Sequence, residues 1–157
     1  MSVEFLTLPD TFLVFKLGGK ELGFEARFLW EAAAAVSLTE VPSNASHLTG
    51  VTQLHGKIIP VLDLSGLLEV PLVSALGEFV TVHLPGPPEI LAGFEVEAVE
   101  GFVKVPGETT GLGDNEMAGA GYIRGFRGAE KKFLWLNIEK IIGGLVSGKT
   151  PALECRD

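Results

Sequence analysis

Apolar and polar positions alternate in short runs along this chain, a pattern typical of β-strands rather than of long helices. The run Thr11–Leu17 is rich in β-forming residues and leads into Gly18 and Gly19. Leu22 and Phe24 then alternate with polar residues or glycine. Because adjacent glycines favour a tight turn between strands, the pattern predicts a β-hairpin at the start of the chain.

After this hairpin the chain favours helical structure on both sides of one short strand. Helix-forming residues dominate Arg27–Ala35, which predicts a short helix or helical turns. Val36–Val41 alternates again and predicts a strand. Ser43 and Asn44 are residue types that cap helices, so a helical turn is expected over Ala45–Leu48.

Strands dominate the rest of the chain. Pro60 cannot donate to a backbone ladder, so its strand is expected to form a sheet edge or to carry a bulge there. Pro106–Gly121 holds five glycines and no apolar period, which predicts a long loop. Asn137 is predicted to cap a last helical turn through Ile142, with a weakly structured tail after Gly144. The predicted strands are Lys57–Leu64, Glu78–Leu84, Ile90–Val96, Val99–Val105, Tyr122–Phe126 and Lys132–Leu136, and the predicted turns are Ser65–Glu69 and Pro85–Glu89.

Short motifs recur in the same order in the two halves of the chain. A repeated order of motifs indicates internal duplication, with about five strands in each half. Small barrels of this size would be marginally stable alone. The expected fold is therefore mainly β: two five-stranded β-barrels that share a hydrophobic core, with short helical segments. The matching segments are Phe12 and Phe79, Gly23–Ala26 and Gly93–Val96, Leu48–Val51 and Ile123–Phe126, and Asp63–Leu68 and Asn137–Ile142.

The composition fits one globular domain. A chain of 157 residues with 46% apolar content is sufficient to build a core. We expect this domain to occupy residues 11–145, with a first lobe at about 11–70 and a second at about 78–142. The chain ends are free to cross between the lobes, and residues 146–157 are expected to form a flexible tail.

Charge and cysteine usage exclude several classes of protein. The chain has 12 basic and 20 acidic residues, a net charge of −8, and no basic cluster, which disfavours nucleic acid and anionic lipid as partners. Its start lacks the basic and apolar regions of a secretory signal, and no apolar run is long enough for a membrane span. The single cysteine, Cys155, cannot form an internal disulfide or a structural zinc site. We expect a cytoplasmic protein.

No residue pattern predicts a metal site, a cofactor or a catalytic centre. The three histidines lack metal-binding spacing. His55, Asp63 and Ser65 are the residue types of a hydrolytic triad, but Ser65 is not in a nucleophile elbow and Asp63 is better explained as a cap. The Gly111-Leu112-Gly113 segment lacks the third glycine of a dinucleotide fingerprint. We therefore expect no enzyme activity.

The two tryptophans differ in their expected environment. Trp135 lies in an apolar context that predicts core packing. Leu29 and Trp30 adjoin Glu31 where the chain leaves the first hairpin, so either core packing or an exposed binding patch is possible there.

The stretch Val36–Leu68 resembles the bacterial chemotaxis adaptor CheW and the CheW-like domain of the kinase CheA. The family pattern is a valine-proline, a glycine, an Asn-Leu-Arg-Gly turn and a strand ending Pro-Val-x-Asp-Leu, with a glutamate eleven residues before the first proline. Here these are Val41-Pro42, Gly50, Gln53-Leu54-His55-Gly56, Pro60-Val61-Leu62-Asp63-Leu64 and Glu31. The second half resembles the family at Gly93-Phe94, Glu97–Gly101, Tyr122-Ile123-Arg124-Gly125 and Leu136-Asn137-Ile138, so the resemblance covers about residues 11–142.

This resemblance implies a non-enzymatic adaptor. Such adaptors bind the cytoplasmic tip of a chemoreceptor in a groove between two barrels and bind the regulatory domain of a CheA-type histidine kinase through barrel ends, which permits assembly of membrane-associated receptor arrays. By position, the implied receptor- or kinase-binding residues are Leu29, Glu31, Gly50, Val51 and His55.

One implied binding residue departs from the family pattern. His55 replaces the usual arginine, which can pair with the glutamate at position 31. An imidazole has neither five donors nor a permanent charge, so a bidentate pair with Glu31 is excluded. His55 is therefore expected either to pack beside the barrel or to take part in altered recognition, and His55→Arg is expected to strengthen or preserve receptor binding. Pilus motility is an alternative pathway.

Two other functions compete with the adaptor. A small-ligand-binding β-barrel protein would use the groove as a pocket. A hydrolase would use His55 and Asp63, and would lose turnover on His55→Ala with its fold intact.

Overall fold

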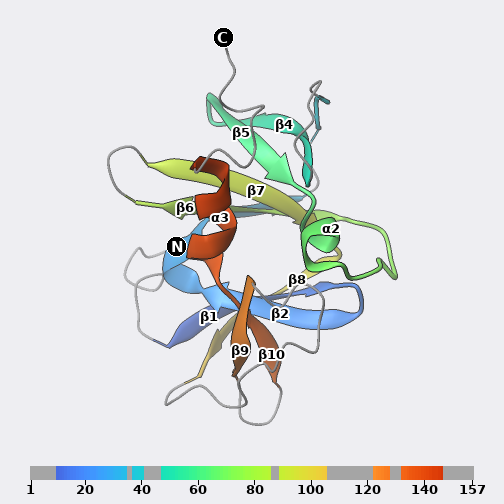
Figure 1. The fold of residues 1–157 in the computed structure, drawn as a ribbon, viewed down its shortest axis with the longest axis vertical. Coiled ribbons are helices and arrows are strands. Elements are labelled where there is room, and N and C mark those ends of the chain that lie inside the picture. The colour runs from blue at the N-terminus through green and yellow to red at the C-terminus, as the bar shows by residue number, and fades with distance from the viewer. Residues whose placement is uncertain are drawn as a thin grey trace.

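The computed structural model describes residues 10–34, 37–40, 47–85, 89–105, 122–127 and 132–146. Two β-sheets lie one above the other, and two short helices flank the space between them (Figure 1). The strands are β1 (Thr11–Leu17), β2 (Lys20–Glu25), β3 (Leu29–Ala34), β4 (Leu48–Leu54), β5 (Lys57–Leu62), β6 (Glu78–Leu84), β7 (Ile90–Val96), β8 (Ala98–Lys104), β9 (Ile123–Arg127) and β10 (Phe133–Leu136). The helices are the 3₁₀ turn η1 (Ala26–Phe28), α2 (Leu64–Leu68) and α3 (Ile138–Val146).

Each sheet takes strands from both halves of the chain. The first sheet has the order β8-β1-β2-β10-β9, and the second has the order β3-β6-β7-β5-β4. The first hairpin of each half is thus completed by three strands of the other half. This fold is mainly β with two five-stranded sheets and short helices, as the sequence predicted. Closure of each sheet into a barrel stays a prediction.

The two halves have the same topology. If β1 to β5 are matched with β6 to β10, the strand orders of the two sheets become identical. The irregularities match as well: one extra residue interrupts β3 at Trp30 and β8 at Glu100. A second pair of extra residues lies at Thr49 in β4 and at Arg124 in β9. This correspondence supports the internal duplication.

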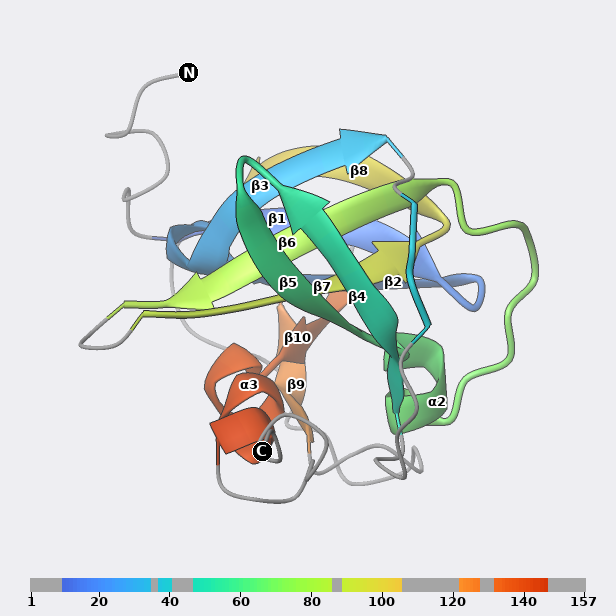
Figure 2. The ribbon, with the colours of Figure 1, turned by 90° about the horizontal axis from the view of Figure 1, so that it is seen from above.

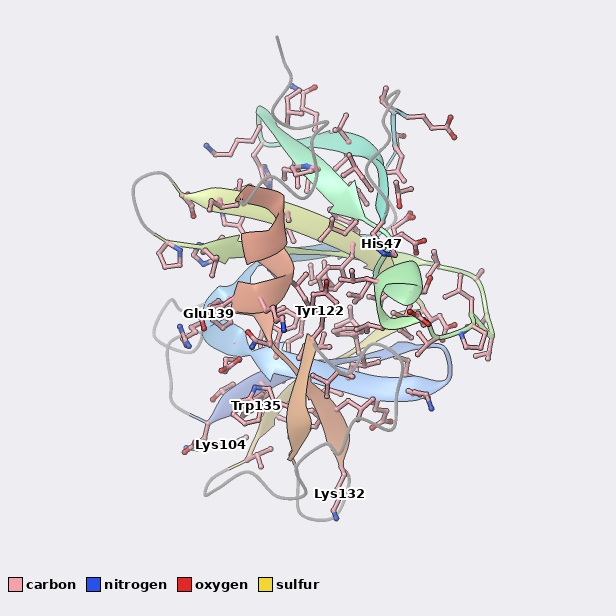
Figure 3. All side chains as sticks on the ribbon, in the orientation of Figure 1. His47, Lys104, Tyr122, Lys132, Trp135 and Glu139 are labelled. Atoms are coloured by element: carbon pink, nitrogen blue, oxygen red, sulfur yellow. The ribbon has the colours of Figure 1, made fainter. Side chains whose placement is uncertain are left out.

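The helices begin in the same way in both halves. The Asp63 carboxylate accepts from the Gly66 N–H at 3.1 Å, and the Asn137 side-chain oxygen accepts from the Lys140 N–H at 3.0 Å. The N–H of each capping residue donates to a backbone carbonyl, that of His47 or that of Tyr122, at 2.8 Å. Figure 3 shows His47 beside α2 and Tyr122 beside α3. Both predicted caps are confirmed.

The main core lies between the sheets and is built from both halves. Phe15 contacts Phe24 and Phe94, with ring centroids 6.2 and 5.7 Å away. Burial of such rings is among the largest favourable terms in folding. A second cluster packs on the other face of the first sheet, and Trp135 lies against it with its ring 5.9 Å from that of Phe12. The shared core is confirmed, and Trp135 packs, partly buried, against the second cluster rather than in the main core.

The helix predicted over Arg27–Ala35 is wrong. Among the described residues 26–34, the only helical turn is Ala26–Phe28, and the chain then continues as β3. β3 pairs with β6 along its length, and Leu29 enters the main core with 7% of its surface exposed. Sheet hydrogen bonds and burial outweigh the helix propensity of the alanines, which amounts to only a few tenths of a kcal/mol per residue.

Several other boundaries differ from the predictions. The turn expected at Ser65–Glu69 is the helix α2, and α3 continues past Gly144 to Val146. Leu48 begins β4 rather than ending a helical turn. In place of a strand over Val36–Val41, the described part of that segment forms one bridge between Thr39 and Val51. The predictions for residues 43–46, 106–121 and 147–157 lie outside the described residues.

Pro60 occupies an interior strand, not the predicted edge. β5 pairs with β4 on one side and with β7 on the other. The pairing with β7 involves only Val61 and Leu62, so Pro60 lies just before it. The missing N–H therefore removes no hydrogen bond from this ladder.

Candidate interaction site

A β-bulge shapes the exposed end of β3. Leu29 lies opposite Val82 and Glu31 lies opposite Thr81, so Trp30 is an extra residue without a counterpart on β6. A bulge of this kind bends a strand and changes the direction of the side chains around it. The bulge thereby places Trp30 and Glu31 side by side at the edge of the second sheet.

A tight turn places His55 opposite these residues. His55 and Gly56 join β4 to β5 with φ angles of 53° and 79°. Two residues with positive φ form the type I′ turn that matches the twist of a hairpin, and histidine is among the residues that tolerate this conformation. Figure 2 shows the tip of the β4–β5 hairpin beside β3.

The turn and β3 are joined by a direct contact. His55 Nε2 lies 2.5 Å from Glu31 Oε1, and the His55 ring is 5.6 Å from that of Trp30 at an interplanar angle of 66°. The side chains of His55 and Glu31 are 61% and 32% exposed. The contact is made through one nitrogen and one oxygen, which agrees with the exclusion of a bidentate pair.

The segment 37–40 runs beside β4 at the other edge of this sheet. Thr39 and Val51 exchange two backbone hydrogen bonds of 2.8 and 2.9 Å, and the Thr52 hydroxyl donates to the Ser37 carbonyl at 2.7 Å. A Cβ atom on Gly50 would lie 2.5 Å from the Thr39 carbonyl oxygen. A glycine at position 50 is therefore required for this close approach.

A surface pocket lies between this segment and the β4–β5 hairpin. Its volume is about 460 Å³. Ile58 is a conspicuous apolar group in its lining, with 66% of its surface exposed. The lining residues are Ser37, Thr39, Val51, Thr52, Gln53 and Ile58. Polar and apolar groups thus alternate around an open depression next to the His55 turn.

The five residues implied by the family resemblance have different environments. Glu31 and His55 are in contact at the surface, whereas Leu29 packs in the core. Gly50 and Val51 support the segment 37–40. Ile58 was not among the candidates, because alternation alone does not reveal which face of a hairpin meets solvent.

His55, Asp63 and Ser65, the residue types of a hydrolytic triad, do not come together in the structure. The Asp63 carboxylate accepts from the Ser65 hydroxyl at 2.8 Å as part of the helix cap. His55 lies at the opposite end of β5, a six-residue strand that spans about 20 Å. In the described ranges, no group of three or more His, Cys, Asp or Glu residues is placed to hold a metal ion. Among the same residues, no helix has the length and apolar character needed to cross a membrane.

Comparison with known proteins places the chain in a family. Its fold is similar to that of the scaffolding protein TtCheW from Thermoanaerobacter tengcongensis, with a TM-score of 0.71 and 22% identity over 82% of this chain and 89% of that one. The chain belongs to the CheW-like domain family, which matches residues 11–145. It is also 33% identical over 58 residues to the chemotaxis protein CheW of Klebsiella aerogenes. That match covers 37% of this chain and about a third, 35%, of that relative's length.

Proposed function

We propose that this chain is a non-enzymatic adaptor that couples chemoreceptors to a CheA-type histidine kinase, in chemotaxis or in a related pathway such as pilus motility. Its family membership supports this proposal, as do the names of its relatives, a chemotaxis protein and a scaffolding protein. The observation that carries it is the exposed contact between Glu31 and His55 beside the surface pocket. The family resemblance implies receptor contact at both positions.

The pocket suits an amphipathic helix such as a receptor's helical hairpin would present. Ile58 and Val51 offer apolar surface, and Ser37, Thr39 and Gln53 offer polar groups around it. Such a helix buries its apolar side chains and uses polar contacts to fix its register. In this proposal Val51, Glu31 and His55 contact the receptor, while Gly50 and Leu29 act indirectly by supporting the site.

The kinase is proposed to bind elsewhere, through its regulatory domain and the ends of the sheets. Binding to both partners would recruit the chain from the cytoplasm to membrane-associated receptor arrays. The net charge of −8 argues against direct attraction to anionic lipid. Recruitment would therefore depend on protein contacts.

The test is a pair of titrations, one with a receptor's cytoplasmic hairpin and one with the kinase regulatory domain. Both are expected to bind. Ile58→Asp is expected to weaken receptor binding about tenfold, because a charge replaces an apolar contact, and to leave kinase binding unchanged. The control is Val103→Asp, which changes an exposed apolar residue on the first sheet and should leave receptor affinity unchanged. If the unaltered chain fails to bind the receptor hairpin, or fails to bind the kinase regulatory domain, the adaptor function is refuted.

A further inference from the structure

The contact between Glu31 and His55 assigns a donor and an acceptor when the carboxylate is ionised and the imidazole is neutral. An ionised carboxylate only accepts hydrogen bonds, so His55 Nε2 must donate to Glu31 Oε1. In the neutral imidazole Nδ1 is then an acceptor. This nitrogen has no hydrogen-bond partner in the part of the chain that the structure describes. The pair thus presents acceptors to solvent.

The charge of this pair differs from that of a glutamate and an arginine. An arginine at position 55 would cancel the charge of Glu31 and would add up to five donors. A neutral histidine leaves the pair with one negative charge and a free acceptor. With a neutral imidazole, the replacement therefore changes the chemistry of the site from donor-rich and neutral to acceptor-rich and anionic.

Trp30 adds a further group that attracts cations. Its ring lies edge to face with the His55 ring at 5.6 Å and is only partly buried. An indole face attracts ammonium and guanidinium groups, with estimates from about 0.5 kcal/mol at exposed sites to about 2 kcal/mol on desolvation. The indole, the carboxylate and the imidazole nitrogen all favour the same type of ligand.

We propose that Trp30, Glu31 and His55 form a charge-selective contact for an arginine or lysine side chain of the receptor hairpin. The inference rests on the adaptor function proposed above and specifies which partner surface the site recognises. Glu31 supplies the charge, while His55 orients its carboxylate and adds an acceptor. A charge-selective contact of this kind reverses the expectation from sequence that His55→Arg preserves or strengthens receptor binding, because an arginine would repel the partner's cation.

Lys57 provides a matched control on the same hairpin. It is exposed at the first position of β5, two residues after His55, and its positive charge opposes the approach of a cation. Lys57→Gln should therefore leave affinity for a basic partner unchanged or increase it. If Lys57→Gln weakens binding instead, the effect comes from altering the turn and not from its charge.

The experiment measures the affinity of the full chain for a receptor hairpin and for a second hairpin in which the basic residues at the tip are changed to glutamate. Glu31→Gln and His55→Arg are each expected to weaken binding of the first hairpin about fivefold or more, as loss of a charge-assisted contact implies. His55→Arg is expected to bind the glutamate hairpin better than the unaltered chain does. Thermal unfolding of each variant verifies that the fold is retained.

The possible failures are distinguishable. If the unaltered chain binds the receptor hairpin but Glu31→Gln and His55→Arg leave that affinity unchanged, the charge-selective contact is refuted and the adaptor function stands. If the unaltered chain binds no receptor hairpin, the adaptor function and this inference fail together.

Discussion

The carboxylate of Glu97 accepts a hydrogen bond from the backbone N–H of Val73 at 2.9 Å, although 24 residues separate them. It also accepts from Ser74 at 3.1 Å and from Gly19 at 3.4 Å. One side chain thus joins the segment between the two halves to the turn of the first hairpin. Burial acts to raise the pKa of Glu97, but the backbone hydrogen bonds outweigh it and lower the pKa below the ordinary 4.5.

Glu97→Gln is expected to lower the melting temperature at pH 7. A lowered pKa in the folded state means that the ionised carboxylate stabilises the fold above the unfolded pKa, and that this stability is lost as pH falls through the folded pKa. The difference between the variant and the unaltered chain should therefore shrink in acid. Thermal unfolding from pH 7 to pH 3 measures it.

Glu100→Gln is the control for this experiment. Glu100 forms an exposed ion pair with Lys16 at 3.4 Å, a type of contact that contributes roughly 0–1 kcal/mol. If Glu97→Gln is no more destabilising at pH 7 than this control, the proposed anchoring role is wrong.

Glu95 should respond in the opposite direction. Burial raises its pKa above the ordinary 4.5. When the pKa of a carboxyl group is higher in the folded state, the protonated group favours the fold below the unfolded pKa, and this contribution is lost as pH rises through the folded pKa. At neutral pH the ionised Glu95 therefore destabilises the fold. Glu95→Gln is expected to be neutral or stabilising at pH 7, with no gain below about pH 4. If Glu95→Gln destabilises the protein, relative to the unaltered chain, more at pH 7 than at pH 4, the raised pKa of Glu95 is contradicted.

Thr81→Val is expected to leave the free energy of unfolding unchanged or to increase it. The Thr81 side chain is fully buried, and its hydroxyl has no hydrogen-bond partner among the described residues. Replacing an unpaired buried hydroxyl with a methyl group of similar shape removes a desolvation cost. Chemical denaturation provides the measurement.

Thr52→Val is the matched control, because the Thr52 hydroxyl donates to the Ser37 carbonyl. Its loss should cost about 1 kcal/mol. Equal destabilisation by the two valine substitutions would show that the Thr81 hydroxyl is in fact satisfied.

Gly50→Ala is expected to destabilise the protein by roughly 1–3 kcal/mol, because its Cβ would collide with the Thr39 carbonyl oxygen. Gly143→Ala, in α3, should instead stabilise it by about 0.5–1 kcal/mol, because the new methyl group meets open space and alanine favours a helix. Denaturation of both variants tests the pair. A harmless Gly50→Ala would mean that the segment 37–40 does not pack against β4.

Alternation and local caps predicted much of the fold. β1, β6 and β7 have the boundaries expected from the sequence, and Asp63 and Asn137 cap helices as expected. These features depend on residues close in the sequence. The exchange of strands between the halves depends on contacts across the whole chain, which alternation does not encode.

The candidate site was predicted only in part. Position in the family pattern identified Glu31 and His55, but their contact depends on the bulge at Trp30 and on the turn at His55 and Gly56. A bulge is defined by the register between two strands, and no local pattern at Trp30 specifies it. For the same reason the sequence predicts a helix where β3 forms: its pairing with β6, 44 to 53 residues later, decides its structure.

The exchange of strands also says something about ancestry. A single half of this chain would contain a hairpin and three further strands but no complete sheet, since each hairpin pairs with strands of the other half. Two identical halves could complete each other only as a strand-swapped homodimer. A gene duplication that joined the subunits of such an obligate pair would leave the two copies free to diverge, and the contact between Glu31 and His55 lies in the first of them.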